Sequence, residues 1–259
     1  MTKLAANLTM LFNEVPFMER FGQAASNGFR AVEFLFPYAF SAADLAQQLA
    51  THRLELVLFN LPAGNWEAGE RGIACHPERV DEFQRGVDEA IRYARALNVR
   101  QVNCLAGIVL QGVARDAAQA TLVANLRFAA DALKSAGIRL LIEPINHFDI
   151  PGFFLTGSTQ ALDIIDATGS DNIWLQYDIY HMQRMEGELA ASMQRHLKRI
   201  AHVQIADNPG RFEPGTGEIN YRFLFDWLTK IGYDGWIGCE YKPRAGTVAG
   251  LGWRDAHGV

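Results

Sequence analysis

Short apolar runs alternate with longer amphipathic stretches along the whole chain. A short, almost wholly apolar run is typical of a strand in a parallel sheet, and apolar positions three or four residues apart are typical of a helix that covers it. Eight such pairs predict a single (β/α)8 TIM barrel. The expected strands span Leu4–Met10, Ala31–Phe36, Leu54–Leu61, Gln101–Ala106, Arg139–Ile145, Ile173–Ile179, His202–Ala206 and Trp236–Tyr241.

Helices are expected between the strands, and their ends carry the usual signals. The clearest helical segments span residues 77–97, 118–137 and 221–232. The last two end on Gly137 and Gly232, because glycine readily adopts the left-handed conformation that closes many helices.

The end of the chain and its undivided composition complete the fold prediction. The last segment, PRAGTVAGLGWRDAHGV, is too rich in glycine for a full helix, so the final helix should be short or irregular. An open doubly wound sheet would give a similar alternation, but no GxGxxG follows the first strand. No Ser/Gly/Pro-rich linker divides the chain, so residues 1–259 are expected to form a single TIM-barrel catalytic domain.

Composition and charge exclude several classes of protein. Hydrophobic residues make up 49% of the chain and charged residues 20%, which is too apolar for a disordered protein. The net charge of -5 and the lack of a Lys/Arg-rich run argue against a nucleic-acid or anionic-membrane partner. Because no signal peptide and no apolar stretch of about 18 residues is present, we expect a cytoplasmic location.

Three cysteines, Cys75, Cys104 and Cys239, lie far apart in the sequence. They show neither a CxxC motif nor the spacing of a zinc site. We therefore expect reduced and mostly buried thiols.

Polar side chains stand at the carboxyl ends of four consecutive expected strands: Glu143, Asp178, Gln204 and Glu240. In a parallel barrel these strand ends form the active-site face, so the four are expected at similar heights around its mouth. Converging carboxylates would repel one another unless a cation lies between them. Oxygen ligands without cysteine favour Mg²⁺ or Mn²⁺ over Zn²⁺. A single acidic residue at a strand end is more often a helix cap or an ion-pair partner. A metal site is favoured here because polar residues recur at four consecutive strand ends.

Three further residues are candidates for substrate binding. His181 follows Asp178 by three positions and can donate to a substrate oxygen, although an isolated histidine is usually structural. Arg211 and Arg71 lie in expected loops and carry the planar group that binds a carboxylate, although surface arginines are common. The glycine-containing loop 213–221 lacks the Gly-Lys-Ser/Thr of a phosphate-binding loop, so it is expected to be an ordered turn in which Asn220 or a neighbour starts the next helix.

Several long and chemically unusual motifs resemble those of the hydroxypyruvate isomerases, within the xylose isomerase-like barrel superfamily that includes the ketose 3-epimerases. The resemblance covers nearly the whole chain. The motifs are ANLTMLFNEVPFMERF, AVEFLFPY, FNLPAGNWEAGERGIAC, AIRYARALN, LIEPINHFDIPGFFLTG, QYDIYHMQRMEGEL, HVQIADNPGRFEPGTGEINY and GCEYKP.

The resemblance implies roles for most of the candidates. It implies metal ligands at Glu143, Asp178, Gln204 and Glu240, with the two glutamates also forming the acid/base pair. Ketose epimerases of the superfamily usually have histidine in place of Gln204, which leaves metal affinity and identity open. Their substrate-contacting His and Arg correspond to His181 and Arg211, whereas Arg71 is added from its chemistry alone.

The implied reaction interconverts hydroxypyruvate and tartronate semialdehyde by metal-assisted proton transfer through an enediolate, in glyoxylate and carbohydrate-acid metabolism. An isomerase for a four-carbon 2-oxotetronate is the nearest alternative, because one extra hydroxymethyl group changes the pocket only modestly. A metal-dependent endonuclease acting at abasic sites and a non-catalytic sugar-acid-binding barrel are more distant alternatives. The expected partner is a small 2-oxo or hydroxy acid, and the oligomeric state, including a homo-oligomer, stays open.

Overall fold

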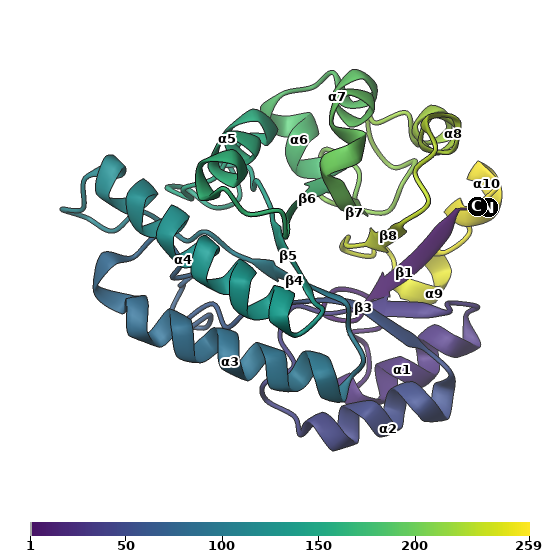
Figure 1. Cartoon of the computed structure of the whole chain (residues 1–259). Helices are drawn as coiled ribbons and strands as arrows, with labels where there is room; N and C mark the ends of the chain where they lie inside the picture. Colours follow the sequence, from purple (N-terminus) through teal and green to yellow (C-terminus); the bar gives the residue numbers. More distant parts are fainter. Residues whose placement is uncertain (1) are drawn as a thin grey trace. The chain divides into compact units, whose positions relative to one another are not determined.

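The computed structural model describes residues 2–259, and the labels of its elements are shown in Figure 1. Its strands follow one another in sequence order around a closed parallel barrel, so the predicted (β/α)8 fold is confirmed. The strands are β1 (Lys3–Asn7), β2 (Ala31–Glu33), β3 (Glu55–Asn60), β4 (Gln101–Cys104), β5 (Arg139–Ile142), β6 (Ile173–Asp178), β7 (Ile200–Ile205) and β8 (Trp236–Cys239).

Helices separate the strands, as the spacing of apolar residues predicts. They are α1 (Phe17–Ser26), α2 (Ala42–His52), α3 (Val80–Ala96), α4 (Arg115–Ser135), α5 (Ser158–Thr168), α6 (Ile179–Met185), α7 (Leu189–His196), α8 (Tyr221–Ile231), α9 (Thr247–Gly250) and α10 (Trp253–His257). Two 3-10 turns, η1 (Pro77–Arg79) and η2 (Leu197–Arg199), precede α3 and β7. After β8 only the short helices α9 and α10 follow, which confirms the predicted irregular end.

All eight predicted strands extend past the observed ones at their carboxyl ends. Leu61, Leu105 and Ile145, for example, lie beyond the ends of β3, β4 and β5, yet all three are buried. The apolar run therefore continues into the first loop residues, which are covered by other parts of the protein although they are not in a strand. Apolar character alone cannot separate these two environments.

The chain forms two compact units that are interleaved in the sequence. One unit contains the residues up to Leu35, then Ala43–Val57 and Tyr177–Val259. The other contains Phe36–Ala42 and Leu58–Gln176. We call them the first and the second unit. A single domain over residues 1–259 stays a prediction.

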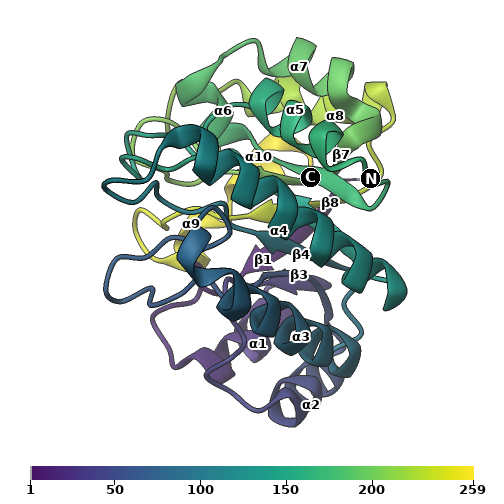
Figure 2. The same ribbon diagram turned by 60° about the vertical axis from the view of Figure 1, so that its left-hand side comes forward.

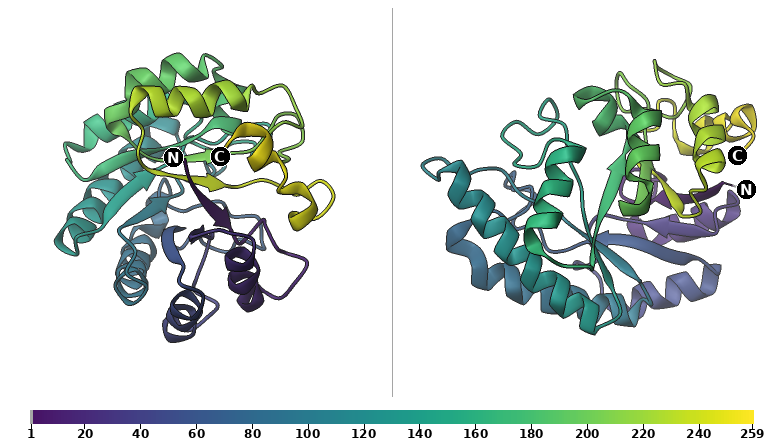
Figure 3. Two further views of the ribbon diagram at one scale, coloured as in Figure 1. Left: turned by 90° about the vertical axis from the view of Figure 1, so that its right-hand side faces the viewer. Right: turned by 45° about the horizontal axis from the view of Figure 1, so that its top comes forward.

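In the first unit, β1 lies between β2 and β8, with Ala5 opposite both Ala31 and Gly238. Figure 3 shows α7 next to α8 in both views. At the end of the chain, Trp253 of α10 stacks on Phe225 of α8 with ring centroids 6.0 Å apart. Helix α10 is thus fixed to α8 by aromatic packing.

In the second unit, α3 and α4 lie side by side, as Figure 2 shows. The buried residues of α3 are Phe83, Val87, Ala90 and Ala94. Their spacing of three or four positions places them on one face of the helix, which is the pattern that predicts this helix from the sequence. Beneath the helices, β4 and β5 pair in parallel.

The helix ends agree with the residues expected there. The Asn220 side chain accepts a hydrogen bond from the backbone N–H of Phe223 at 3.2 Å and so caps α8. Gly232 ends the same helix with a φ of 84°, a conformation that a residue with a side chain rarely adopts.

The predictions on cysteines and membrane spans can also be compared with the structure. Cys75, Cys104 and Cys239 are free and buried, as expected. Among residues 2–259, no helix has both the length and the apolar character needed to cross a bilayer.

Candidate active site

A layer of hydrogen-bonded polar side chains is buried in the first unit. It consists of Asn7, Glu33, His202, Gln204 and Glu240, none of which is more than 7% exposed. Polar groups are buried at this depth only where they bond to one another, because an unsatisfied buried group costs free energy. We call these five residues the polar layer.

Two side-chain amides connect the two carboxylates of the polar layer. The Gln204 Nε2 group donates to Glu33 Oε1 at 2.8 Å and to Glu240 Oε2 at 2.5 Å. The Asn7 Nδ2 group donates to the same two oxygens at 3.0 and 3.1 Å. Each amide thus lies between two acceptors, and both carboxylates are held by the same pair of donors.

Glu33 is fixed on its other side by His202. The His202 Nε2 atom lies 2.7 Å from Glu33 Oε2, and because the carboxylate is an acceptor, Nε2 is the ring nitrogen that carries the proton. A methyl group added to Gly238 would lie 2.4 Å from both Glu33 oxygens. Glycine on β8 is therefore what allows the Glu33 carboxylate to occupy this position.

Glu240 follows β8, and its surroundings change the pKa of its carboxyl group. Burial raises its pKa to about 8, and the nearby charges of Glu33 and Asp178 act in the same direction. Arg211 opposes this shift, because its Nη2 group donates to Glu240 Oε1 at 2.6 Å. A carboxyl group with a raised pKa can both hold and release a proton near neutral pH, which is what an acid/base catalyst needs.

Asp178 ends β6 and starts α6. Its Oδ1 atom accepts hydrogen bonds from the backbone N–H groups of Tyr180 and His181 at 2.7 and 3.1 Å. Its Oδ2 atom is buried and accepts no hydrogen bond from any described residue, although Arg211 Nη2 and His181 Nε2 each lie 3.7 Å away. Burial raises the pKa of Asp178. An oriented and buried carboxylate oxygen that accepts no hydrogen bond is suited to bind a divalent cation.

His181 and Arg211 lie on the same side of the first unit as Asp178. Burial lowers the pKa of His181 well below its usual value, and the charge of Arg211 adds to this, so the imidazole is neutral at neutral pH. The Arg211 guanidinium lies over the Tyr180 ring at 5.4 Å. The structure thus brings the predicted residues Asp178, His181, Arg211 and Glu240 together.

The loop that carries Arg211 is organised by a buried carboxylate. Asp207 accepts hydrogen bonds from the backbone N–H groups of Gly215, Gly217 and Ile219 at 2.8 to 3.1 Å. Arg211 itself has a φ of 59°, and its carbonyl accepts from the Lys242 N–H at 2.7 Å. These contacts hold the arginine in a conformation that a non-glycine residue rarely adopts.

In the second unit, Glu143 follows β5 and is held in a similar way. Gln176 Nε2 on β6 and Asn103 Nδ2 on β4 donate to Glu143 Oε2 at 2.9 and 3.3 Å. Asn103 also donates to Asn60 Oδ1 at 3.1 Å. Glu143 and Glu240 thus share one arrangement. Each follows a strand and accepts hydrogen bonds from side-chain amides on both neighbouring strands. The hydrogen bonds from Gln176 and Asn103 therefore explain how the Glu143 carboxylate can be buried although the surrounding sequence is apolar.

Arg71 lies in the loop after β3, in the second unit. Its guanidinium donates to the carbonyls of Trp66 and Glu70 at 2.9 and 2.7 Å. It also stacks on the Trp66 ring at 4.1 Å. These contacts order its own loop, and a role for Arg71 toward a substrate stays a prediction.

Sequence reasoning missed Glu33, Asn7 and His202 in the first unit, and Asn103 and Gln176 in the second. All five are polar residues within or at the end of a strand. The signal was present, because AVEF places Glu33 behind an apolar pair in the same way that LLIE places Glu143. Asn7, Glu33 and Asn103 lie on the first four strands, where no strand-end residue is predicted from the sequence. Gln176 and His202 each lie two positions before a predicted residue on the same strand.

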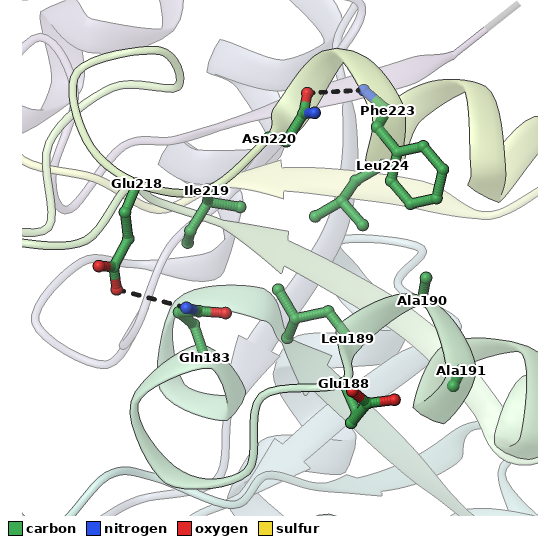
Figure 4. A pocket seen from close by; sticks show the side chains of 10 residues that line it. All are labelled: Gln183, Glu188, Leu189, Ala190, Ala191, Glu218, Ile219, Asn220, Phe223 and Leu224. Carbon is green, nitrogen blue, oxygen red and sulfur yellow. Dashed lines mark hydrogen bonds between the residues drawn. The ribbon is translucent and has the colours of Figure 1, made fainter.

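A hollow of about 350 Å³ lies on the first unit near the start of α8, and Figure 4 shows the side chains that line it. Its polar groups bond within the protein: Gln183 Nε2 donates to Glu218 Oε1 at 3.3 Å, and Asn220 caps α8. None of the predicted site residues lines it. The buried acidic residues are therefore the better candidate site.

The raised pKa of Glu240 predicts a pH dependence of stability in the protein freed of metal. Between about pH 5 and pH 8, folded Glu240 keeps a proton that the unfolded chain has lost, so the free energy of unfolding should fall as the pH rises. One such proton gives a slope of about 1.4 kcal/mol per pH unit. Urea unfolding in the presence of a chelator should show a smaller slope for Glu240→Gln, and equal slopes would contradict the shift.

Comparison with known proteins agrees with the barrel fold. Residues 21–257 match a family model described as xylose isomerase-like TIM barrel. Hydroxypyruvate isomerase of Escherichia coli (strain K12) is 57% identical over 257 residues, which cover 99% of this chain and 100% of that protein. The 2-oxo-tetronate isomerase of Cupriavidus necator is 46% identical, with 98% and 97% coverage.

A solved structure is also similar over its full length. It is described as AP endonuclease, family 2 from Brucella melitensis, with a TM-score of 0.96, 45% identity and coverage of 99% of both chains. Together, fold and relatives define the class as (β/α)8-barrel enzymes. The chain belongs to the xylose isomerase-like TIM barrel family and, within it, to the hydroxypyruvate isomerase family. This family and the buried Asp178 and His181 of the first unit are compatible with a divalent metal ion.

Proposed function

We propose that the protein is a hydroxypyruvate isomerase, which interconverts hydroxypyruvate and tartronate semialdehyde. The observation that carries the proposal is the 57% identity to the Escherichia coli hydroxypyruvate isomerase over the full length of both chains. The buried glutamates Glu143 and Glu240 support it, because each follows a strand and is oriented by amide donors. Carbohydrate-acid and glyoxylate metabolism is the corresponding context, and a cytoplasmic location stays a prediction from the sequence.

The proposed cofactor is one divalent ion, Mg²⁺ or Mn²⁺, with Glu143, Asp178, Gln204 and Glu240 as ligands. All four offer oxygen, the donor that these ions prefer. The Asp178 Oδ2 atom supports this assignment, because it is buried and accepts no hydrogen bond from the described residues. When bound, such an ion supplies a Lewis acid that stabilises negative charge on the substrate oxygens.

The reaction moves hydrogen between neighbouring carbons. A carboxylate base removes a proton from C3 of hydroxypyruvate, and the electrons of the broken C–H bond form the C2–C3 double bond of an enediolate. A carboxylic acid then delivers a proton to C2, and a proton moves from the C3 oxygen to the C2 oxygen, which leaves an aldehyde at C3. We assign the two carbon proton transfers to Glu143 and Glu240, whose roles exchange when the direction of reaction is reversed.

Substrate binding is assigned to His181, Arg211 and Arg71. A neutral imidazole, which the burial of His181 favours, can accept or donate a proton at a substrate hydroxyl. The planar guanidinium of an arginine can bind the substrate carboxylate through two hydrogen bonds. Arg211 is the better placed of the two arginines, because it already contacts Glu240.

Turnover on two acids tests the proposal against its nearest alternative. The relatives named 2-oxo-tetronate isomerases are 43% to 46% identical to the chain, so a four-carbon substrate has direct support. Proton NMR in D₂O can follow loss of the C3 hydrogens of hydroxypyruvate and the appearance of the aldehyde. We expect kcat/KM for hydroxypyruvate to exceed that for 2-oxotetronate by at least about tenfold, the usual scale for one extra carbon group. The reverse preference would assign the protein to the four-carbon alternative.

The similarity to the Brucella protein gives a second test, because that protein is described as an AP endonuclease. A duplex with one abasic site should stay uncut under conditions in which hydroxypyruvate is isomerised. The net charge of -5 favours this outcome, since DNA binding depends on basic residues. Incision of the duplex without turnover of either acid would replace the isomerase assignment.

A further inference from the structure

The orientation of the Gln204 amide matters for the proposed metal site, because only one end of an amide can ligate a cation. The oxygen has lone pairs to donate, whereas the NH₂ group does not. The two ends have nearly the same shape, so packing alone does not distinguish them. Something in the chain must therefore select the orientation.

We propose that Glu33 is a positioning residue: its carboxylate holds the Gln204 NH₂ group and so leaves the amide oxygen for the metal. The inference rests on the proposed function, because it assumes a metal ligand at Gln204. Its basis in the structure is the hydrogen bond from Gln204 Nε2 to Glu33 Oε1 at 2.8 Å. A carboxylate only accepts, so it favours the nitrogen end of the amide over the oxygen end.

Glu240 is a poorer partner for this task, although Gln204 Nε2 also donates to its Oε2 atom at 2.5 Å. Glu240 is itself a proposed metal ligand, and its Oε1 atom accepts from Arg211 Nη2 at 2.6 Å. Glu33 is not a proposed ligand, so its carboxylate can hold the Gln204 NH₂ group whether or not the metal is bound.

The surroundings of Glu33 fit a fixed anchor. His202 Nε2 binds its Oε2 atom at 2.7 Å, and Asn7 Nδ2 donates to its Oε1 atom at 3.0 Å. The carboxylate is 1% exposed, and Gly238 leaves the space that it occupies. Some residues do not touch the metal but orient one of its ligands through a hydrogen bond. Replacing such a residue commonly lowers metal affinity by about 10- to 100-fold.

The test is Mn²⁺ affinity, measured by calorimetry on purified, metal-free protein. Glu33→Gln should weaken binding by at least about tenfold, because an amide at position 33 can bond to either end of Gln204. The double variant Glu33→Gln with Gln204→Glu should bind within about threefold of the wild type. In that variant the new amide donates to the new carboxylate, and either carboxylate oxygen can ligate, so the requirement for orientation is removed. Loss of affinity without rescue would indicate general damage and overturn the proposal.

Two further variants separate positioning from stability. Glu213→Gln makes the same chemical change at a buried glutamate that accepts from the Arg244 N–H, outside the polar layer, and should keep wild-type affinity. Gly238→Ala should reproduce the effect of Glu33→Gln, because its methyl group would displace the Glu33 carboxylate. The melting temperature of each metal-free variant is the control for folding.

The outcomes distinguish this inference from the proposed function. If the wild type binds Mn²⁺ and Glu33→Gln binds it equally well, Glu33 does not position the ligand, and the proposed function is unaffected. If the wild type itself does not bind Mn²⁺ or Mg²⁺, the metal assignment is wrong, and the role of Glu33 is refuted with it.

Discussion

Glutamine in place of Glu143 or Glu240 is expected to lower kcat for hydroxypyruvate by at least about a hundredfold, the usual effect of removing a general acid or base. Glutamine has nearly the same shape and can still accept the amide hydrogen bonds that hold each glutamate. It cannot take up or deliver the proton. The loss should therefore appear in turnover and not in the fold, and initial rates at saturating substrate measure it.

A surface glutamate provides the control for this pair of variants. Glu82 pairs with Arg79 on the outside of the second unit, and Glu82→Gln should keep the wild-type rate. The circular dichroism spectrum of every variant should match that of the wild type. Turnover within about threefold of the wild type for either Glu143→Gln or Glu240→Gln would show that the residue is not an acid or base in this reaction.

The repeating pattern of strands and helices was predictable because it depends on local sequence. Each strand of the barrel is a short apolar run, and the buried positions of helices such as α3 recur every three or four residues. The caps at Asn220 and Gly232 are local too. The predicted strand ends were less accurate, because residues such as Leu105 are apolar and buried although they lie beyond the last residue of the strand.

The candidate site was only partly predictable, because its contacts join residues far apart in the sequence. Asp178 and Glu240 were found from their positions at strand ends. The bonds that orient them were not, since Gln204 reaches Glu33 across 171 residues of sequence. Nothing local in the sequence shows that its NH₂ group faces two carboxylates. This depends on the order of strands around the barrel and on the space left by Gly238.

Loop residues were the hardest to assign. Arg211 and Arg71 have the same chemistry and both lie in loops, yet one contacts Glu240 and the other its own loop. The difference arises from backbone conformation, because the turn around Asp207 directs Arg211 toward β8. Such turns are formed by side-chain to backbone bonds that a residue pattern does not specify.

Removal of divalent metal should abolish most of the isomerase activity, by at least about a hundredfold, since Lewis-acid stabilisation of an oxyanion contributes several kcal/mol to the rate. Prolonged dialysis against a chelator, followed by elemental analysis, defines the metal-free state. Added Mn²⁺ or Mg²⁺ should restore the rate. The protein should remain folded without metal, because side-chain amides donate hydrogen bonds to Glu143 and Glu240 and so stabilise the buried carboxylates.

The same experiment distinguishes a catalytic metal from a structural one. Asp178→Asn keeps the shape of a proposed ligand but removes its charge, so it should require much more Mn²⁺ for half-maximal rate while the metal-free melting temperature does not fall. Burial raises the pKa of Asp178, which means that its charge is unfavourable in the metal-free fold and its loss does not destabilise it. A metal-free preparation that turns over hydroxypyruvate at the full rate would refute the metal role and leave proton transfer by Glu143 and Glu240 to be explained without it.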